Sequence, residues 1–279
     1  MVRRGRSTEW VAQPQSHCTV SPRWRQRGFS SILIPGSSTY GGAPLVPVNA
    51  GRIIPAPGNA LALSGSGGTS DGWRSALLAN ELNSATAITS VIALTTDGSG
   101  IAVGRWGAAA YYGGWLVAPN ANGMAFLASS GPGSANWYAP YTVPLNDGKF
   151  HVIVYRWIAP NTGTIWLDGA LSAPAGLWFN GSAANIQSGV SEYLWFNRHA
   201  DSGTGSPGAG TRVAWYGHTT QALSDSECLS LSQNPWQLAQ AARRAPITGA
   251  SIAMPTLGPV RYTPGTLTST GFGIRVDAT

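Results

Sequence analysis

The chain has 279 residues, of which 36 are glycine, 19 are proline and only 10% are charged. Ordinary globular domains carry about a quarter of charged residues, so this content excludes a helical bundle or a coiled coil. Twelve tryptophans exclude a disordered chain. The composition therefore predicts many short strands joined by Gly/Pro turns.

The net charge of +6 is concentrated at the start of the chain. Residues 1 to 27 hold six arginines and one acid, Glu9, whereas the remainder holds eleven basic and ten acidic residues. Residues 1 to 45 show no sustained periodicity, so we expect an extended basic arm there. Such an arm is either a solvated tail or a contact to an acidic partner. In the second case its partner-binding residues are Trp10, Arg23, Trp24, Arg25, Arg27 and Phe29.

Strand patterns begin at residue 86. In residues 86–95, Ile88, Ile92 and Leu94 share one face. The strongest pattern, FHVIVYRWI at 150–158, is apolar on both faces, which predicts a central strand in a layered sheet structure. Strands with turn signals between them predict a β-sandwich or barrel. The other expected strands are 101–106, 114–119, 123–128, 162–169, 192–197 and 211–217.

One short helix is predicted near the end of the chain. Ser224 and Glu227 have the S-x-x-E spacing of a capping box, and Leu223 with Cys228 has the spacing of a hydrophobic staple. A proline then ends the helix, and the next residue, Trp236, should pack the chain back onto the sandwich. The predicted structural clip consists of Leu223, Ser224, Glu227, Cys228 and Trp236.

Two segments carry a resemblance to a known family. KFHVIVYRWIAPNTGTIWLDGAL (149–171) resembles the paired strands of concanavalin A-like (laminin G-like) jelly rolls. ALSDSECLSLSQNPWQL (222–238) is similar to the end of such domains in virion proteins of tailed bacteriophages, although Ala239 stands where a Phe is expected. The resemblance covers roughly residues 86 to 240 and implies an all-β fold, an antiparallel concanavalin A-like β-sandwich.

We therefore expect three regions: an arm over 1–45, a sandwich over 46–240 and a strand extension over 241–279. The extension resembles the opening strands of an immunoglobulin- or fibronectin-like module but is too short for a complete one, which needs about 100 residues. Its strands must lie against the sandwich or pair with a neighbouring subunit, because two strands alone are marginally stable.

Catalytic chemistry is not indicated. Glycosidases of this fold use two carboxyl groups, and the one close pair, Asp225 and Glu227, belongs to a helix N-terminus. Asp168 precedes a glycine and indicates a turn, and His151 is expected to be a satisfied core histidine. No metal, phosphate-loop or nucleophile motif is present. We expect no enzyme, no cofactor and no metal.

The remaining signals concern the compartment. Cys18 and Cys228 lie in unlike contexts and leave a disulfide open. No secretory signal and no apolar run of membrane-spanning length are visible. We expect a soluble protein made in a reducing cytosol, without membrane insertion.

Two functional hypotheses remain. The first is a non-enzymatic virion structural protein, made in the host cytoplasm, that decorates or attaches to a phage head or tail. Its partners would be other virion proteins and copies of itself, without specific nucleic-acid recognition. The alternative is a carbohydrate-binding adhesion module of a tail fibre or bacterial surface protein. Its glycan-binding residues would be Tyr111, Tyr112, Trp115, Trp137 and Tyr138, although most tryptophans are expected in the core.

Overall fold

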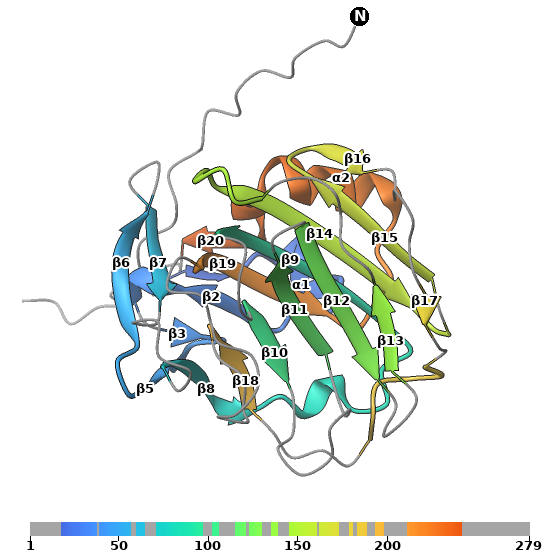
Figure 1. Ribbon diagram of the computed structural model, residues 1–279, viewed down its shortest axis with the longest axis horizontal. Helices are drawn as coiled ribbons and strands as arrows, with labels where there is room; N and C mark the ends of the chain where they lie inside the picture. Colours follow the sequence, from blue (N-terminus) through green and yellow to red (C-terminus); the bar gives the residue numbers. More distant parts are fainter. Residues whose placement is uncertain are drawn as a thin grey trace, which may run out of the picture. The chain divides into compact units, whose positions relative to one another are not determined.

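The protein is an antiparallel β-sandwich, as the sequence predicts (Figure 1). The structure, a computed structural model, describes residues 18–37, 39–56, 60–64, 71–96, 102–105, 115–120, 123–129, 135–138, 145–160, 162–172, 179–180, 183–188, 193–197 and 211–241. Within these segments no helix is long and apolar enough to cross a membrane.

One layer is a ten-stranded sheet in which every pairing is antiparallel. Its strands are, along the main path, β16 (Ala170–Ser172), β15 (Thr162–Leu167), β14 (His151–Ile158), β9 (Ala87–Thr95), β19 (Arg212–Thr219), β2 (Ile32–Ile34), β3 (Thr39–Tyr40) and β4 (Ala43–Pro44), with β7 (Ala60–Ser64) also on β19 and β6 (Arg52–Ala56) on β7.

The other layer is an eight-stranded antiparallel sheet, whose strands β10 to β13 are green in Figure 1. Its order is β17 (Phe179–Asn180), β13 (Ala135–Tyr138), β12 (Gly123–Ser129), β11 (Trp115–Asn120), β10 (Val103–Arg105), β18 (Tyr193–Phe196), β8 (Gly72–Leu78) and β5 (Val46–Val48).

Short elements complete the described chain. They are β1 (Cys18–Val20), which pairs with β20 (Ala239–Ala241), the helices α1 (Pro22–Gln26) and α2 (Asp225–Gln233), and the 3-10 turns η1 (Pro35–Ser37), η3 (Asn80–Leu82) and η4 (Pro235–Leu238).

The main core lies between the two sheets. Alternate residues of β9 and β14 point into it, among them Ile92 and Tyr155, and the opposite sheet contributes Val103 and Phe196. The predicted face of β9, with Ile88, Ile92 and Leu94, is confirmed. Residues of the same strands that point the other way are also buried, so the ten-stranded sheet is covered on both faces.

The outer face of the ten-stranded sheet forms a second core, which we call the outer core. Val91, Val154 and Trp215 supply its sheet side, and α1, α2 and η4 cover it. Figure 1 shows α2, in orange, beside β14, β15 and β16. The pairing of β1 with β20 joins the first and last described strands over this face.

The predicted clip is present. The Ser224 side chain accepts the Glu227 backbone N–H, and Glu227 accepts the Ser224 backbone N–H, which is a complete capping box. Cys228 is fully buried in the outer core, where burial raises the pKa of its thiol to about 12. Trp236 packs edge to face on Trp215 with ring centroids 4.9 Å apart. The helix end is therefore anchored by aromatic packing.

The expected arm over residues 1–45 is wrong for its described part, which begins at residue 18. Trp24 is 1% exposed and Phe29 is fully buried, and the two rings pack edge to face 5.8 Å apart. Both belong to the outer core instead of a neighbour's groove, because the sheet face beneath them is apolar. Trp10 lies outside the described residues.

A buried histidine fastens the β15–β16 hairpin to β14. Asp168 and Gly169 both have positive φ, 49° and 81°, the conformation that an Asp-Gly hairpin turn requires. His151 Nδ1 lies 2.8 Å from Asp168 Oδ2, and Nε2 lies 3.0 Å from Asp147 Oδ1. Asp168 Oδ1 also accepts the Val152 N–H at 2.8 Å. The histidine is thus a structural group between two carboxylates.

The outer core yields a first prediction. Trp24→Ala and Trp236→Ala should each lower the free energy of unfolding by about 3–5 kcal/mol, because each removes a large buried ring. Urea unfolding measures this loss. Leu171→Ala is the control, since Leu171 is 60% exposed and should change stability by less than about 0.5 kcal/mol. Wild-type stability of Trp24→Ala would show that the N-terminal segment is not part of the folded body.

The His151 contacts yield a second prediction. Burial lowers the pKa of His151, but the hydrogen bonds and charges of Asp168 and Asp147 outweigh it, so the folded pKa is raised. Its stabilisation is therefore complete below the unfolded pKa of about 6.5 and lost as pH rises through the folded value. The stability difference between wild type and His151→Gln should shrink between about pH 6 and pH 8, measured by urea unfolding. A difference that grows with pH would contradict this assignment.

Candidate functional site

A pocket of about 120 Å³ lies at the edge of the sandwich, where β3 and β8 approach each other. Each of these strands lies one position from the end of its sheet, and β4 contacts β8. We call it the Glu81 pocket. Its lining residues are Ser30, Ser31, Tyr40, Gly41, Ser75, Leu77, Leu78, Ala79 and Glu81.

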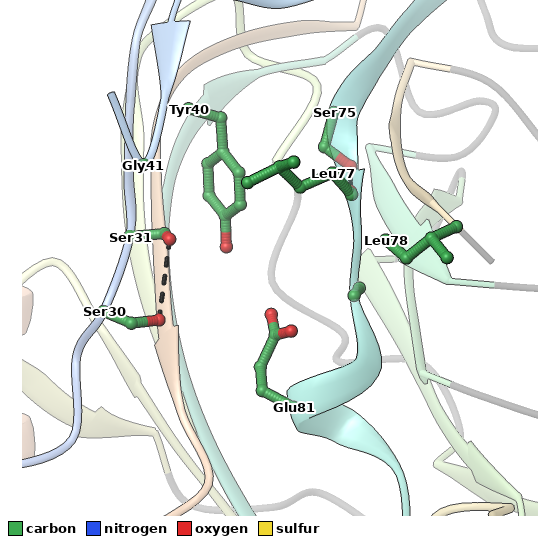
Figure 2. A pocket seen from close by; sticks show the side chains of 9 residues that line it. Ser30, Ser31, Tyr40, Gly41, Ser75, Leu77, Leu78 and Glu81 are labelled. Carbon is green, nitrogen blue, oxygen red and sulfur yellow. Dashed lines mark hydrogen bonds between the residues drawn. The ribbon is translucent and has the colours of Figure 1, made fainter. Parts of the chain in front are cut away.

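The pocket has two unlike walls. Ser30 and Ser31 stand on the wall next to β2, and Figure 2 shows them opposite Leu77 and Leu78. Leu77 is 69% exposed and Leu78 is 38% exposed, so one wall carries aliphatic side chains at the surface. The Tyr40 hydroxyl and the Glu81 carboxylate point toward each other across the space between the walls (Figure 2).

A buried histidine connects these two polar groups. His218 Nδ1 lies 3.1 Å from the Tyr40 hydroxyl, and His218 Nε2 lies 3.1 Å from Glu81 Oε1. An ionised carboxylate can only accept, so the Nε2–H of His218 donates to Glu81. The arrangement holds Glu81 in one orientation.

Glu81 carries a negative charge at neutral pH. Burial raises its pKa, but the hydrogen bond and charge of His218, with the charge of Arg105, outweigh it and lower the pKa overall. The Arg105 guanidinium is fully buried and donates to Ala79 O at 3.1 Å and Asn83 Oδ1 at 2.8 Å. Since these two acceptors flank η3, Arg105 also fixes the turn that carries Glu81.

Tyr40 remains a neutral hydroxyl. Burial, and then the negative charges that Tyr216 and Glu81 can carry, raise its pKa well above the usual value, only partly offset by a hydrogen bond with Ser31. It is therefore neither a base nor a nucleophile at neutral pH. Glycoside hydrolysis generally uses two carboxyl groups, and among the described residues that line this pocket Glu81 is the one carboxylate. The geometry suits binding better than catalysis.

The sequence did not single out this site. Tyr40 falls in the expected arm, Glu81 in a segment without a clear pattern, and His218 just after an expected strand. No local spacing relates the three residues, which are brought together only by the order of strands in the sheets.

The residues predicted to bind glycan are placed elsewhere. Trp115 lies in β11, and Trp137 and Tyr138 lie in β13, on either side of β12; the structure describes their backbone only. Tyr111 and Tyr112 lie outside the described residues. The predicted aromatic site stays a prediction.

The arginines predicted to contact a partner lie in or beside α1. Arg27 Nε lies 2.6 Å from Glu227 Oε1 of the capping box, so this arginine pairs with an acid of its own chain. Arg23 lies over the Trp24 ring, and Arg25 contacts the Val20 carbonyl at 3.4 Å. Arg27 thus has a contact within its own chain, and the predicted partner contact of the three arginines stays a prediction.

The other chemistry-bearing residues form no metal site. Within the described segments no group of three His, Cys, Asp or Glu side chains is arranged to hold a metal ion. Cys18 and Cys228 are not joined in a disulfide.

Comparison with known proteins identifies the fold. No protein-family model and no curated protein matches the chain. The binding domain of botulinum neurotoxin DC in complex with SialylT matches with a TM-score of 0.53 and 10% identity, over 73% of this chain and 50% of that chain. The same domain in complex with rat synaptotagmin II matches with a TM-score of 0.53 and 10% identity, over 74% of this chain and 51% of that chain. The binding domain of Paraclostridial Mosquitocidal Protein 1 matches with a TM-score of 0.52 and 10% identity, over 74% of this chain and 52% of that chain.

At these identities the likeness establishes the fold alone. The chain spans about half the length of the structures that it matches. The protein shares the β-sandwich architecture found in these binding domains.

Proposed function

We propose that the chain is a non-enzymatic binding module that recognises a glycan in the Glu81 pocket. The observation that carries this proposal is the pairing of a fixed carboxylate with serine hydroxyls and an exposed leucine wall in one small concave site. Binding sites of this kind orient a ligand with a few placed polar groups and hold it by apolar contact.

A sugar ring matches both walls. Its hydroxyl groups can donate to Glu81 and exchange hydrogen bonds with Ser30 and Ser31, while its C–H face packs on Leu77. A pocket of about 120 Å³ is smaller than the roughly 300–1,000 Å³ of drug-sized sites. It therefore suits one terminal ring, with the remainder of the glycan in solvent.

The comparisons support binding as the general role. One matching domain was solved in complex with SialylT and in complex with rat synaptotagmin II, and this chain matches about half of it. The support is at the level of fold, and the ligand of this chain is argued from its own pocket.

The place of the module on a bacteriophage particle is a further part of the proposal, supported by sequence resemblance. The residues that carry it are the paired-strand segment 149–171 and the helix with NPWQL at 222–238. A module with weak single sites gains avidity when many copies are displayed on one particle. A purely structural decoration protein, acting through protein contacts, is the second candidate that this resemblance favours.

The proposal predicts the effect of one charge. Glu81→Gln should reduce glycan binding at least about tenfold, because a hydrogen bond to a charged group contributes about 1.5–3 kcal/mol. The measurement is binding of multivalent protein to a glycan array. Asp147→Asn is the matched control, since it removes one carboxylate that does not line the pocket.

The outcomes separate the alternatives. Equal binding by wild type and Glu81→Gln would exclude this pocket, and loss in Trp115→Ala or Trp137→Ala would then favour the predicted aromatic site. Absence of binding to every glycan would remove the proposed function and favour the structural decoration protein.

A further inference from the structure

The charge of the Glu81 pocket restricts its ligand. Of the nine described residues that line it, Glu81 is charged and none is basic. The basic groups that act on Glu81 are His218, whose Nε2 lies 3.1 Å from Glu81 Oε1, and Arg105, and neither lines the pocket. The Arg105 guanidinium is buried and donates to Ala79, Asn83 and Gln187, the last at 3.1 Å. The described part of the pocket lining therefore offers no cation to neutralise an anionic ligand.

The hydrogen-bonding groups lead to the same restriction. A carboxylate offers about four acceptor positions and no donor. His218 occupies one of them, and the backbone N–H of Glu81 occupies another. The remaining capacity suits the hydroxyl or ammonium donors of a ligand. A ligand carboxylate brought to this position could not donate to Glu81 and would repel it.

From this geometry we infer that the pocket takes an uncharged or amine-bearing hexose ring and rejects a sugar that carries a carboxylate, such as sialic acid. The inference rests on the proposed function and names the substrate class of the same site. Selectivity comes from the fixed negative charge and not from the size of the ring. A hexosamine also brings an ammonium group of its own, which can pair with the Glu81 carboxylate.

The test varies the charge on the ligand and on the protein separately. The probes are array glycans that end in a neutral hexose or hexosamine, the same glycans capped with sialic acid, and the capped glycans with the carboxyl group converted to a primary amide. The amide keeps the size of sialic acid without its charge. The proteins are wild type, Glu81→Gln and the control Asp147→Asn, each displayed multivalently.

Wild type should bind the neutral glycans, and should bind the amide at least about tenfold better than the free acid, a factor that corresponds to about 1.4 kcal/mol. The difference in affinity between the amide and the acid should disappear in Glu81→Gln and persist in Asp147→Asn. It should also narrow at high salt, because exposed charges are screened.

Three outcomes would overturn the inference. Equal binding of acid and amide by wild type would show that charge does not select the ligand. Tighter binding of the acid would require a cation that the pocket lining lacks. A gap that is unchanged in Glu81→Gln would place the selecting charge elsewhere. In each of these cases glycan binding itself, and with it the proposed function, would stand, whereas absence of all glycan binding would remove both.

Discussion

Val91, Val154 and Trp215 place apolar side chains on the face of the ten-stranded sheet that points away from the sandwich interior. Exposure of such a face to water is unfavourable, so the fold depends on its cover. The cover comes from both ends of the described chain: α1 and Phe29 from one, and α2 with η4 from the other. The β1–β20 pairing and the hydrogen bond from Ser21 N to Leu238 O, 2.8 Å long, join the two halves of the cover.

The sequence predicted the part of this arrangement that has a local signal. The two apolar faces of residues 150–158 indicated a central strand, and the S-x-x-E spacing with NPW indicated the capped helix. Both signals are local, because each lies within a single strand or within one or two helical turns. The N-terminal half of the cover has no such signal: β1 has three residues and α1 has five. Trp24 and Phe29 stand among arginines and resemble interface anchors, and only contacts with strands far along the chain bury them.

The candidate site was less predictable than the fold, for a related reason. Tyr40 and His218 are 178 residues apart, and His218 and Glu81 are 137 residues apart. A single histidine, a single acid and a tyrosine in a turn-rich segment carry no spacing that indicates a site. The strand order sets them together, since β3 and β19 are separated only by β2 within one sheet and η3 follows β8 of the other.

The helices that cover the outer core and the Glu81 pocket are connected by shared contacts. His218 and Thr219 are adjacent in β19 and point to opposite sides: His218 holds Glu81, and the Thr219 hydroxyl donates to the Arg27 carbonyl at 2.7 Å. The Arg27 side chain in turn pairs with Glu227 of the capping box. The serine wall of the pocket begins three residues after Arg27, so its position is fixed by the same contacts. A site whose acceptor and wall are both held in this way loses little free energy to ordering when a ligand binds. That property matters most for a pocket of single-ring size, where few contacts are available to offset such a loss.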